Sequence, residues 1–95
     1  MIYTIVFSST AIESFDAIKS QIEERFGSKT VSEFEERILK VLEVISLSPE
    51  VFQSIKQSSN VRKGFIHKNC SMFYEVKATQ VEILFFWDNR QEPIL

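Results

Sequence analysis

The residues best suited to chemistry lie in the last third of the chain. His67 is the only imidazole, and a histidine, with a reference pKa of about 6.5, can act as an acid or a base near neutral pH. Between Lys56 and Lys77 there are five lysines or arginines against one acid, Glu75. Arg90 follows the last apolar stretch in a short polar tail, and polar groups beyond a strand end are common site residues. This region can therefore hold an anionic partner, although an ordinary solvated mixture of charges is an equally good interpretation.

The formal net charge of -2 is divided unevenly along the chain. Residues 1–50 contain five Lys/Arg and nine Asp/Glu, a net of -4, whereas residues 51–95 contain six and four, a net of +2. The single cysteine, Cys70, excludes an internal disulfide and fits a reducing cytoplasm, or is simply a half-buried strand residue. The sequence has no glycine-rich phosphate loop and no metal-ligand spacing, so we expect no cofactor and no bound metal.

Three strands are predicted around these residues. Residues 72–76 are rich in β-formers, and residues 81–87 form an almost unbroken apolar run, as in a strand buried on both faces. The polar residues 77–80 between them have the length of a hairpin loop. Residues 61–67 mix apolar and basic side chains and are joined to Cys70 by a turn-like Lys68-Asn69. Together these segments predict an antiparallel meander.

The first half supplies one strand and two helices. Residues 2–7 are β-branched and aromatic and predict a strand. Thr10–Glu13 and Thr30–Glu33 both match the capping-box pattern, so we expect a helix to begin at each, with Gly27 ending the first. Apolar residues of each helix share an arc of about 100–120°, the width of one core-facing stripe. The short link between the helices makes them an antiparallel hairpin.

This order predicts one domain, residues 1–95, of α+β class, with a two-layer arrangement in which the helix hairpin packs on an antiparallel-rich sheet. The other face and the strand ends are left for a partner. The N-terminal segment lacks the features of a signal peptide, and no apolar run approaches roughly 18 residues, so we expect a cytoplasmic protein without membrane contact. The predicted common core consists of Phe15, Ile22, Phe34, Ile38, Leu42, Ile83 and Phe85.

Over its whole length the chain resembles the RelE/ParE toxins of bacterial type II toxin-antitoxin modules. The resemblance rests on the order of elements, on Arg62 at the start of the second strand, and on the segments 73–76, 81–84 and 88–93. The last segment, which follows an apolar strand, looks especially like the plasmid-stabilisation toxins of this family. The resemblance implies the two-layer RelE/ParE-like fold, with the order β-α-α-β-β-β.

The resemblance also implies a small toxin that is neutralised by a cognate antitoxin protein wrapped around it. Family members like RelE cut mRNA in the ribosome, whereas those like ParE poison DNA gyrase. We predict a toxin that acts on mRNA at the ribosome as an endoribonuclease. The alternatives are a ParE-like DNA gyrase inhibitor and a catalytically decayed module that only binds antitoxin. The partners are thus the antitoxin and either the ribosome with mRNA or gyrase, and a homodimer is left open.

An RNA-cleaving site needs cations for the scissile phosphate, a base for the 2′-hydroxyl and an acid for the leaving oxygen. The resemblance places Arg62 and Arg90 where the family binds phosphate, and His67 is the natural substitute acid or base. These three are the predicted catalytic residues. Gly64 and Ser71 occupy positions where the family carries further cations, and Leu95 ends the chain before the C-terminal tyrosine or histidine of many family ribonucleases. Enzymatic activity is therefore left open.

The predicted site residues also have simpler interpretations, and the one for Arg90 is the weakest because it lies in a polar tail beyond a buried strand. His67 is five residues from Arg62, so it lies on the opposite face of a regular strand and reaches the same site only through a bulge. It is otherwise a plain turn histidine. Arg62 is otherwise a surface cation near Glu75 or Glu82, a pair of small energetic weight.

Overall fold

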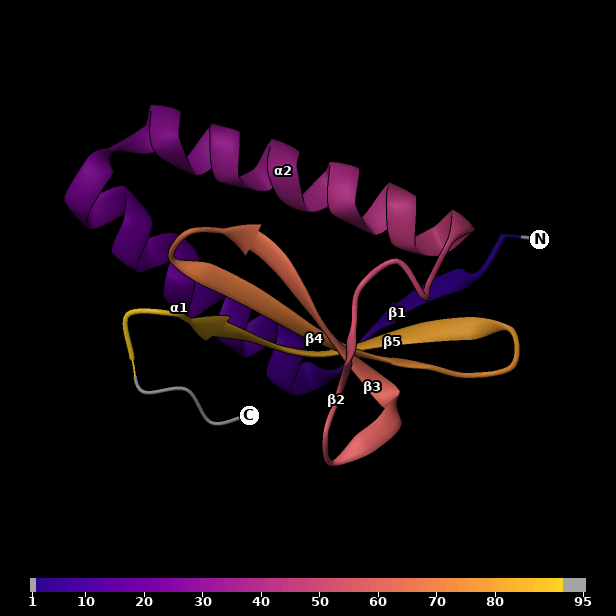
Figure 1. The fold of residues 1–95 in the computed structure, drawn as a ribbon. Coiled ribbons are helices and arrows are strands. Elements are labelled where there is room, and N and C mark those ends of the chain that lie inside the picture. The colour runs from indigo at the N-terminus through magenta and orange to yellow at the C-terminus, as the bar shows by residue number, and fades with distance from the viewer. Residues whose placement is uncertain (1, 92–95) are drawn as a thin grey trace.

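In the computed structural model, which describes residues 2–91, two helices pack on a five-stranded sheet (Figure 1). The strand order is β1-β5-β4-β3-β2; β1 runs parallel to β5, and the other neighbours are antiparallel. The predicted order and the α+β class are confirmed, and β2 is an addition within the connector. The elements are β1 (Thr4–Phe7), α1 (Ser9–Phe26), α2 (Ser28–Leu47), β2 (Ser54–Ile55), β3 (Ser58–His67), β4 (Cys70–Val76) and β5 (Gln80–Asp88).

Both helices begin earlier than their capping-box patterns predicted. Ser8, not Thr10, caps α1: its hydroxyl accepts from the Ala11 amide at 3.0 Å and donates to the Leu84 carbonyl of β5 at 2.7 Å. The cap is thus tied to the sheet, which the local pattern could not reveal. Gly27 ends α1 as predicted and is followed directly by α2; its φ of 89° lies in a region that favours glycine. Thr30 lies inside α2, and its hydroxyl donates to the Phe26 carbonyl at the end of α1, at 3.4 Å, rather than capping the start of α2.

The core forms where the helices meet one face of the sheet. Four residues of the predicted core, Ile22, Phe34, Ile38 and Ile83, are buried there, and Phe15 and Leu42 are partly buried against them. The same core also holds seven side chains with no exposed surface: Ala11, Ile45, Ile66, Cys70, Met72, Tyr74 and Val81. Neither α1 nor α2, the helices of the described residues, has the length and apolar character that crossing a membrane requires.

The predicted core position of Phe85 is wrong. The β4–β5 register shifts after Phe73, which pairs with Phe85, because the next pair is Tyr74 with Ile83. One extra residue of β5, Leu84, therefore reverses the alternation, and Phe86 rather than Phe85 faces the helices. The ring of Phe85 instead stacks on Phe73 at 4.6 Å on the opposite face. For the same reason β5 is not buried along its whole length on both faces.

Candidate functional site

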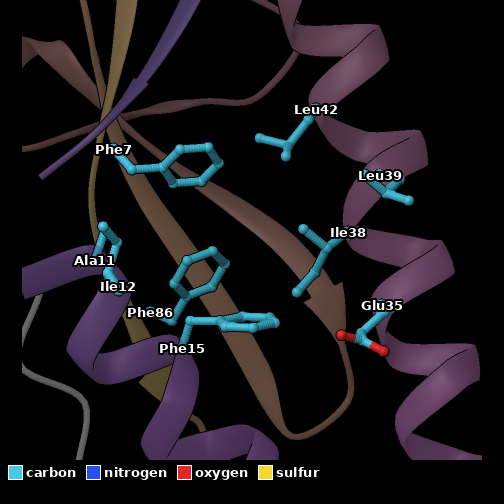
Figure 2. A pocket seen from close by; sticks show the side chains of 9 residues that line it. All are labelled: Phe7, Ala11, Ile12, Phe15, Glu35, Ile38, Leu39, Leu42 and Phe86. Carbon is cyan, nitrogen blue, oxygen red and sulfur yellow. The ribbon is translucent and has the colours of Figure 1, made fainter.

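An apolar groove lies between the two helices. The helix groove, as we call it, has a volume of about 320 Å³, and its walls come from β1 and α1 on one side and from α2 on the other (Figure 2). Phe86 of β5 closes its floor. The lining residues are Phe7, Ala11, Ile12, Phe15, Glu35, Ile38, Leu39, Leu42 and Phe86.

Three large apolar side chains of this groove are strongly exposed. The exposed fractions are 42% for Phe7, 53% for Ile12 and 65% for Leu39. Ile12 belongs to the stripe of α1 that predicted a core position, but the first part of α1 stands apart from α2 and leaves it uncovered (Figure 1). Contiguous apolar surface of this kind is typical of a protein-binding site.

One charged residue, Glu35, lies at the end of the helix groove. Its Oε2 atom is 3.2 Å from Nζ of Lys19, and the two side chains are 41% and 40% exposed. An ion pair between two such exposed side chains contributes only about 0–1 kcal/mol. Glu35 is therefore free to exchange Lys19 for another cation.

Arg62 does not face an open surface. It pairs with Tyr74, whose ring is part of the core, so its side chain leaves the sheet on the helix side. There its Nη1 atom donates to the carbonyls of Phe52 and, at 3.3 Å, of Glu50. The guanidinium thus ties the connector after α2 to the sheet, rather than pairing with Glu75 or Glu82.

The same connector explains why position 64 is a glycine. A Cβ atom on Gly64 would lie 3.2–3.3 Å from the ring of Phe52, which covers this position. A longer side chain would have to displace that ring. The connector is fixed further by Tyr74, whose hydroxyl donates to the Pro49 carbonyl at 2.8 Å.

Arg90 lies just after β5, as predicted, but its charge is already paired. Its Nη2 and Nε atoms bind the Asp88 carboxylate at 2.7 and 3.0 Å, and Nη2 also reaches Gln21 of α1 at 3.2 Å. These hydrogen bonds hold the pKa of Asp88 below its usual value. The pair opens onto a polar pocket that also contains Arg25. A phosphate that binds the Nε–Nη2 edge of Arg90 would have to replace Asp88.

His67 reaches the helix side because β3 carries a bulge. The register shifts between Phe65 and His67, and His67 pairs with Cys70, whose thiol is in the core. The imidazole lines a second cavity of about 280 Å³ beside Arg37. Burial, Arg37 and Lys68 all lower the pKa of His67, and its Nδ1 atom accepts a hydrogen bond from the Asn69 amide at 3.3 Å.

The three predicted residues do not form one site. Along β4, the partner of Arg62 is Tyr74 and the partner of His67 is Cys70, four residues or about 13 Å away. His67 and Arg90 share the other end of the sheet, but Arg90 is directed to α1 and His67 to the cavity beside α2. Their catalytic roles stay predictions. Within residues 2–91, no three His, Cys, Asp or Glu side chains are grouped as metal ligands would be.

Two features of these surfaces were missed by reasoning from sequence. Arg37, which donates to the Ile66 carbonyl and faces His67, had no signal that distinguished it from other helix cations. The helix groove did have a signal in the sequence. Leu39 is a large apolar residue outside the core-facing arc of α2, and it is the most exposed side chain of the groove.

No protein-family model and no curated protein sequence matches this chain. Solved structures are similar in fold: a chain of the chromosomal ParDE TA system from P. aeruginosa has a TM-score of 0.74 at 15% identity, covering 92% of this chain and 96% of its own. A chain of the E. coli DinJ-YafQ toxin-antitoxin complex has 0.66 at 5%, covering 95% and 96%. The YoeB dimer from Staphylococcus aureus has 0.64 at 14%, covering 90% and 94%. The chain therefore has the RelE/ParE-type toxin fold that the resemblance implied.

Proposed function

We propose that this chain is the toxin of a type II toxin-antitoxin module and that a segment of its antitoxin binds in the helix groove. The groove is the observation that carries the proposal. Covering an exposed Phe, Ile or Leu contributes roughly 1.5–3 kcal/mol for each side chain fully buried. Phe7, Ile12 and Leu39 are 42%, 53% and 65% exposed, so burying each contributes less than this full amount and still favours a protein partner. The fold shared with chains of two toxin-antitoxin systems, ParDE and DinJ-YafQ, supports this assignment.

For the action on the target, the geometry favours inhibition by binding, as in a gyrase inhibitor, over cleavage of RNA. The supporting observation is that both candidate phosphate ligands are engaged within the chain, Arg62 with the connector and Arg90 with Asp88. Ribosome-dependent mRNA cleavage is the second candidate. It is supported by the position of Arg90 beside Arg25 at an open polar pocket, where a phosphate could compete with Asp88.

The binding proposal is tested by coexpressing the tagged chain with the small protein encoded beside it and measuring copurification. Leu39→Asp places a carboxylate in the groove and should abolish copurification. Val44→Asp is the matched control, because Val44 is an exposed apolar residue of α2, at 46%, that does not line the groove. Equal loss in both variants, or failure of the wild-type chain to bind its neighbour, would contradict the proposal.

The action is tested by inducing the chain without its partner and following growth, protein synthesis and plasmid supercoiling. A gyrase inhibitor should change supercoiling before translation falls and should produce no mRNA fragments. An mRNA endoribonuclease should stop translation first, with fragments that map to translated codons. An unchanged culture, with partner binding intact, would leave only the decayed binding module.

A further inference from the structure

We propose that the cavity lined by His67 and Arg37 binds a free α-amino acid with an apolar side chain. The turn cavity, as we call it, has a volume of about 280 Å³ and shares no lining residue with the helix groove. Its walls come from the last half of α1, the first half of α2 and the residues around the β3–β4 turn. The proposal concerns a different part of the molecule from the proposed function above and does not depend on it.

The apolar part of the turn cavity is incompletely covered. Ile22 of α1 and Phe34 of α2 line it and are buried, whereas Phe26, at the end of α1, lines it and is 55% exposed. An aromatic side chain in this position gains free energy when an apolar group covers it. The cavity lies near the lower end of the size range of small-molecule sites, so the ligand must be small. A branched aliphatic or aromatic side chain of an amino acid meets both conditions.

Arg37 and His67 supply donors for the carboxylate of such a ligand. Nη1 of Arg37 donates to the Ile66 carbonyl at 3.3 Å, and no acid within residues 2–91 lies at ion-pair distance from this guanidinium. Nδ1 of His67 accepts from the Asn69 amide at 3.3 Å, so Nε2 is the ring nitrogen that can donate. Donors from α2 and from the end of β3 thus line one cavity. A guanidinium with free N–H groups beside a second donor suits a carboxylate.

Glu33 decides between a simple carboxylic acid and an amino acid. It lines the same cavity one helical turn before Arg37, and among the described residues no cation pairs with it. Side chains four positions apart on a helix are neighbours, with about 5–6 Å between their Cβ atoms. An α-amino acid carries an ammonium and a carboxylate on one carbon atom, so it can bind Glu33 with the first and Arg37 with the second. A carboxylic acid without the ammonium would be repelled by Glu33.

The test measures the binding of L-phenylalanine and L-leucine to the full chain, at up to about 10 mM because so small a ligand binds weakly. Two-dimensional NMR should show shifts of the amides around Phe26, Glu33, Arg37 and His67. Thermal unfolding should move to higher temperature, since the ligand binds only the folded chain. Phenethylamine, which lacks the carboxylate, and 3-phenylpropionate, which lacks the ammonium, should each bind about 10-fold or more weakly than phenylalanine.

Two variants separate the two ends of the ligand. Glu33→Gln should weaken phenylalanine about 10-fold and bind 3-phenylpropionate at least as well as the wild type does, because a repelling carboxylate is removed. Arg37→Gln should weaken both ligands. Glu36→Gln is the matched control, an exposed acid of α2 that does not line the turn cavity, and should change neither affinity by more than about 2-fold. Circular dichroism checks the folding of each variant, and Glu33→Gln keeps its meaning if Arg37→Gln disturbs the contact with the Ile66 carbonyl.

Three results would overturn the proposal. The first is the absence of shifts around the turn cavity with either amino acid at the highest concentration. The second is equal binding of phenylalanine and 3-phenylpropionate, which would mean that the cavity takes a carboxylate alone, such as the carboxyl terminus of a protein partner. The third is a set of shifts confined to the helix groove, which would place the amino acid there instead.

Discussion

The guanidinium of Arg90 donates hydrogen bonds to both carboxylate oxygens of Asp88, with Nη2–Oδ2 at 2.7 Å and Nε–Oδ1 at 3.0 Å. The backbone amide of Arg90 also donates to Oδ1 at 2.9 Å, which closes a tight turn after β5. Asp88 is only 8% exposed, so the pair fixes the end of the strand. The cation predicted to hold a phosphate is thus neutralised by the residue two positions before it.

This pair predicts a component of acid stability. Arg90 lowers the pKa of Asp88 in the folded chain, so the contribution is fully present above the unfolded pKa of about 3.9 and is lost as pH falls through the lower folded value. Asp88→Asn should therefore be less stable than wild type at pH 7, and the difference should shrink below about pH 4. Urea midpoints measured from pH 7 to pH 2 test this. A gap that stays constant across this range would mean that the carboxylate is not the stabilising group.

Replacing Arg90 separates the two candidate actions. If the chain cleaves RNA, Arg90→Ala should slow cleavage on the order of 100- to 1000-fold, because a charge-assisted contact to the transition state is lost. Arg90→Lys should rescue little, since an ammonium lacks the planar fork. If the chain inhibits gyrase, fragments should be absent for every variant. Cleavage of ribosome-bound mRNA and gyrase supercoiling are measured side by side, with Lys77→Ala, an exposed cation in the turn between β4 and β5, as control.

We expect Arg62 to stabilise the folded chain rather than to bind phosphate. Arg62→Ala removes the donors to the Phe52 and Glu50 carbonyls and should lower the free energy of unfolding by roughly 1.5–3 kcal/mol, the range for hydrogen bonds to charged groups. Lys63→Ala, at the next and exposed position, removes a cation–π contact with Phe73 and should cost no more than about 1 kcal/mol. Limited proteolysis should cut Arg62→Ala first in the connector. An unchanged stability with lost toxicity would restore the phosphate-binding role.

The pKa of His67 should depend on the charge of Arg37. In the folded chain, burial, Arg37 and Lys68 lower the His67 pKa below the ordinary 6.5. As pH falls through 6.5 the unfolded chain takes up this proton first, so folding stability declines until the folded pKa is passed. An NMR titration of the imidazole should give a midpoint below 6.5, and Arg37→Gln should raise it. Arg25→Gln, on α1 near Asp88, should leave it unchanged.

Two neighbouring positions of α2 should separate folding from partner binding. Ile45 is fully buried, so Ile45→Ala should cost roughly 2–5 kcal/mol of unfolding free energy. Leu42 is only partly buried and lines the groove, so Leu42→Ala should cost roughly 1 kcal/mol and weaken partner binding more than stability. Urea unfolding and copurification measure the two effects. A larger stability loss at Leu42 than at Ile45 would place the centre of the core elsewhere.

The elements and the fold class were predictable because they depend on local patterns. The apolar stripes of α1 and α2 repeat with the helical period, and Gly27 supplies the positive φ that separates them. The β-rich segments around Phe73 and Ile83 are bounded by polar turns, so a meander followed from adjacency alone.

The face on which each side chain lies was decided by the tertiary structure. The single extra residue Leu84 exchanges Phe85 for Phe86 in the core, and a second bulge turns His67 to the helix side. Neither bulge leaves a mark in the alternation of the sequence, because a register shift is a property of two strands together.

The state of the candidate site was likewise decided by contacts between distant segments. Arg62 is bound by carbonyls at residues 50 and 52, and Arg90 is connected to Gln21, 69 positions away. The helix groove exists because the first part of α1 stands apart from α2, which leaves Ile12 and Leu39 exposed. The sequence alone determined which residues are apolar and which are charged. Only the packing angle of the helices and the register of the strands determined which of them remain free for a partner.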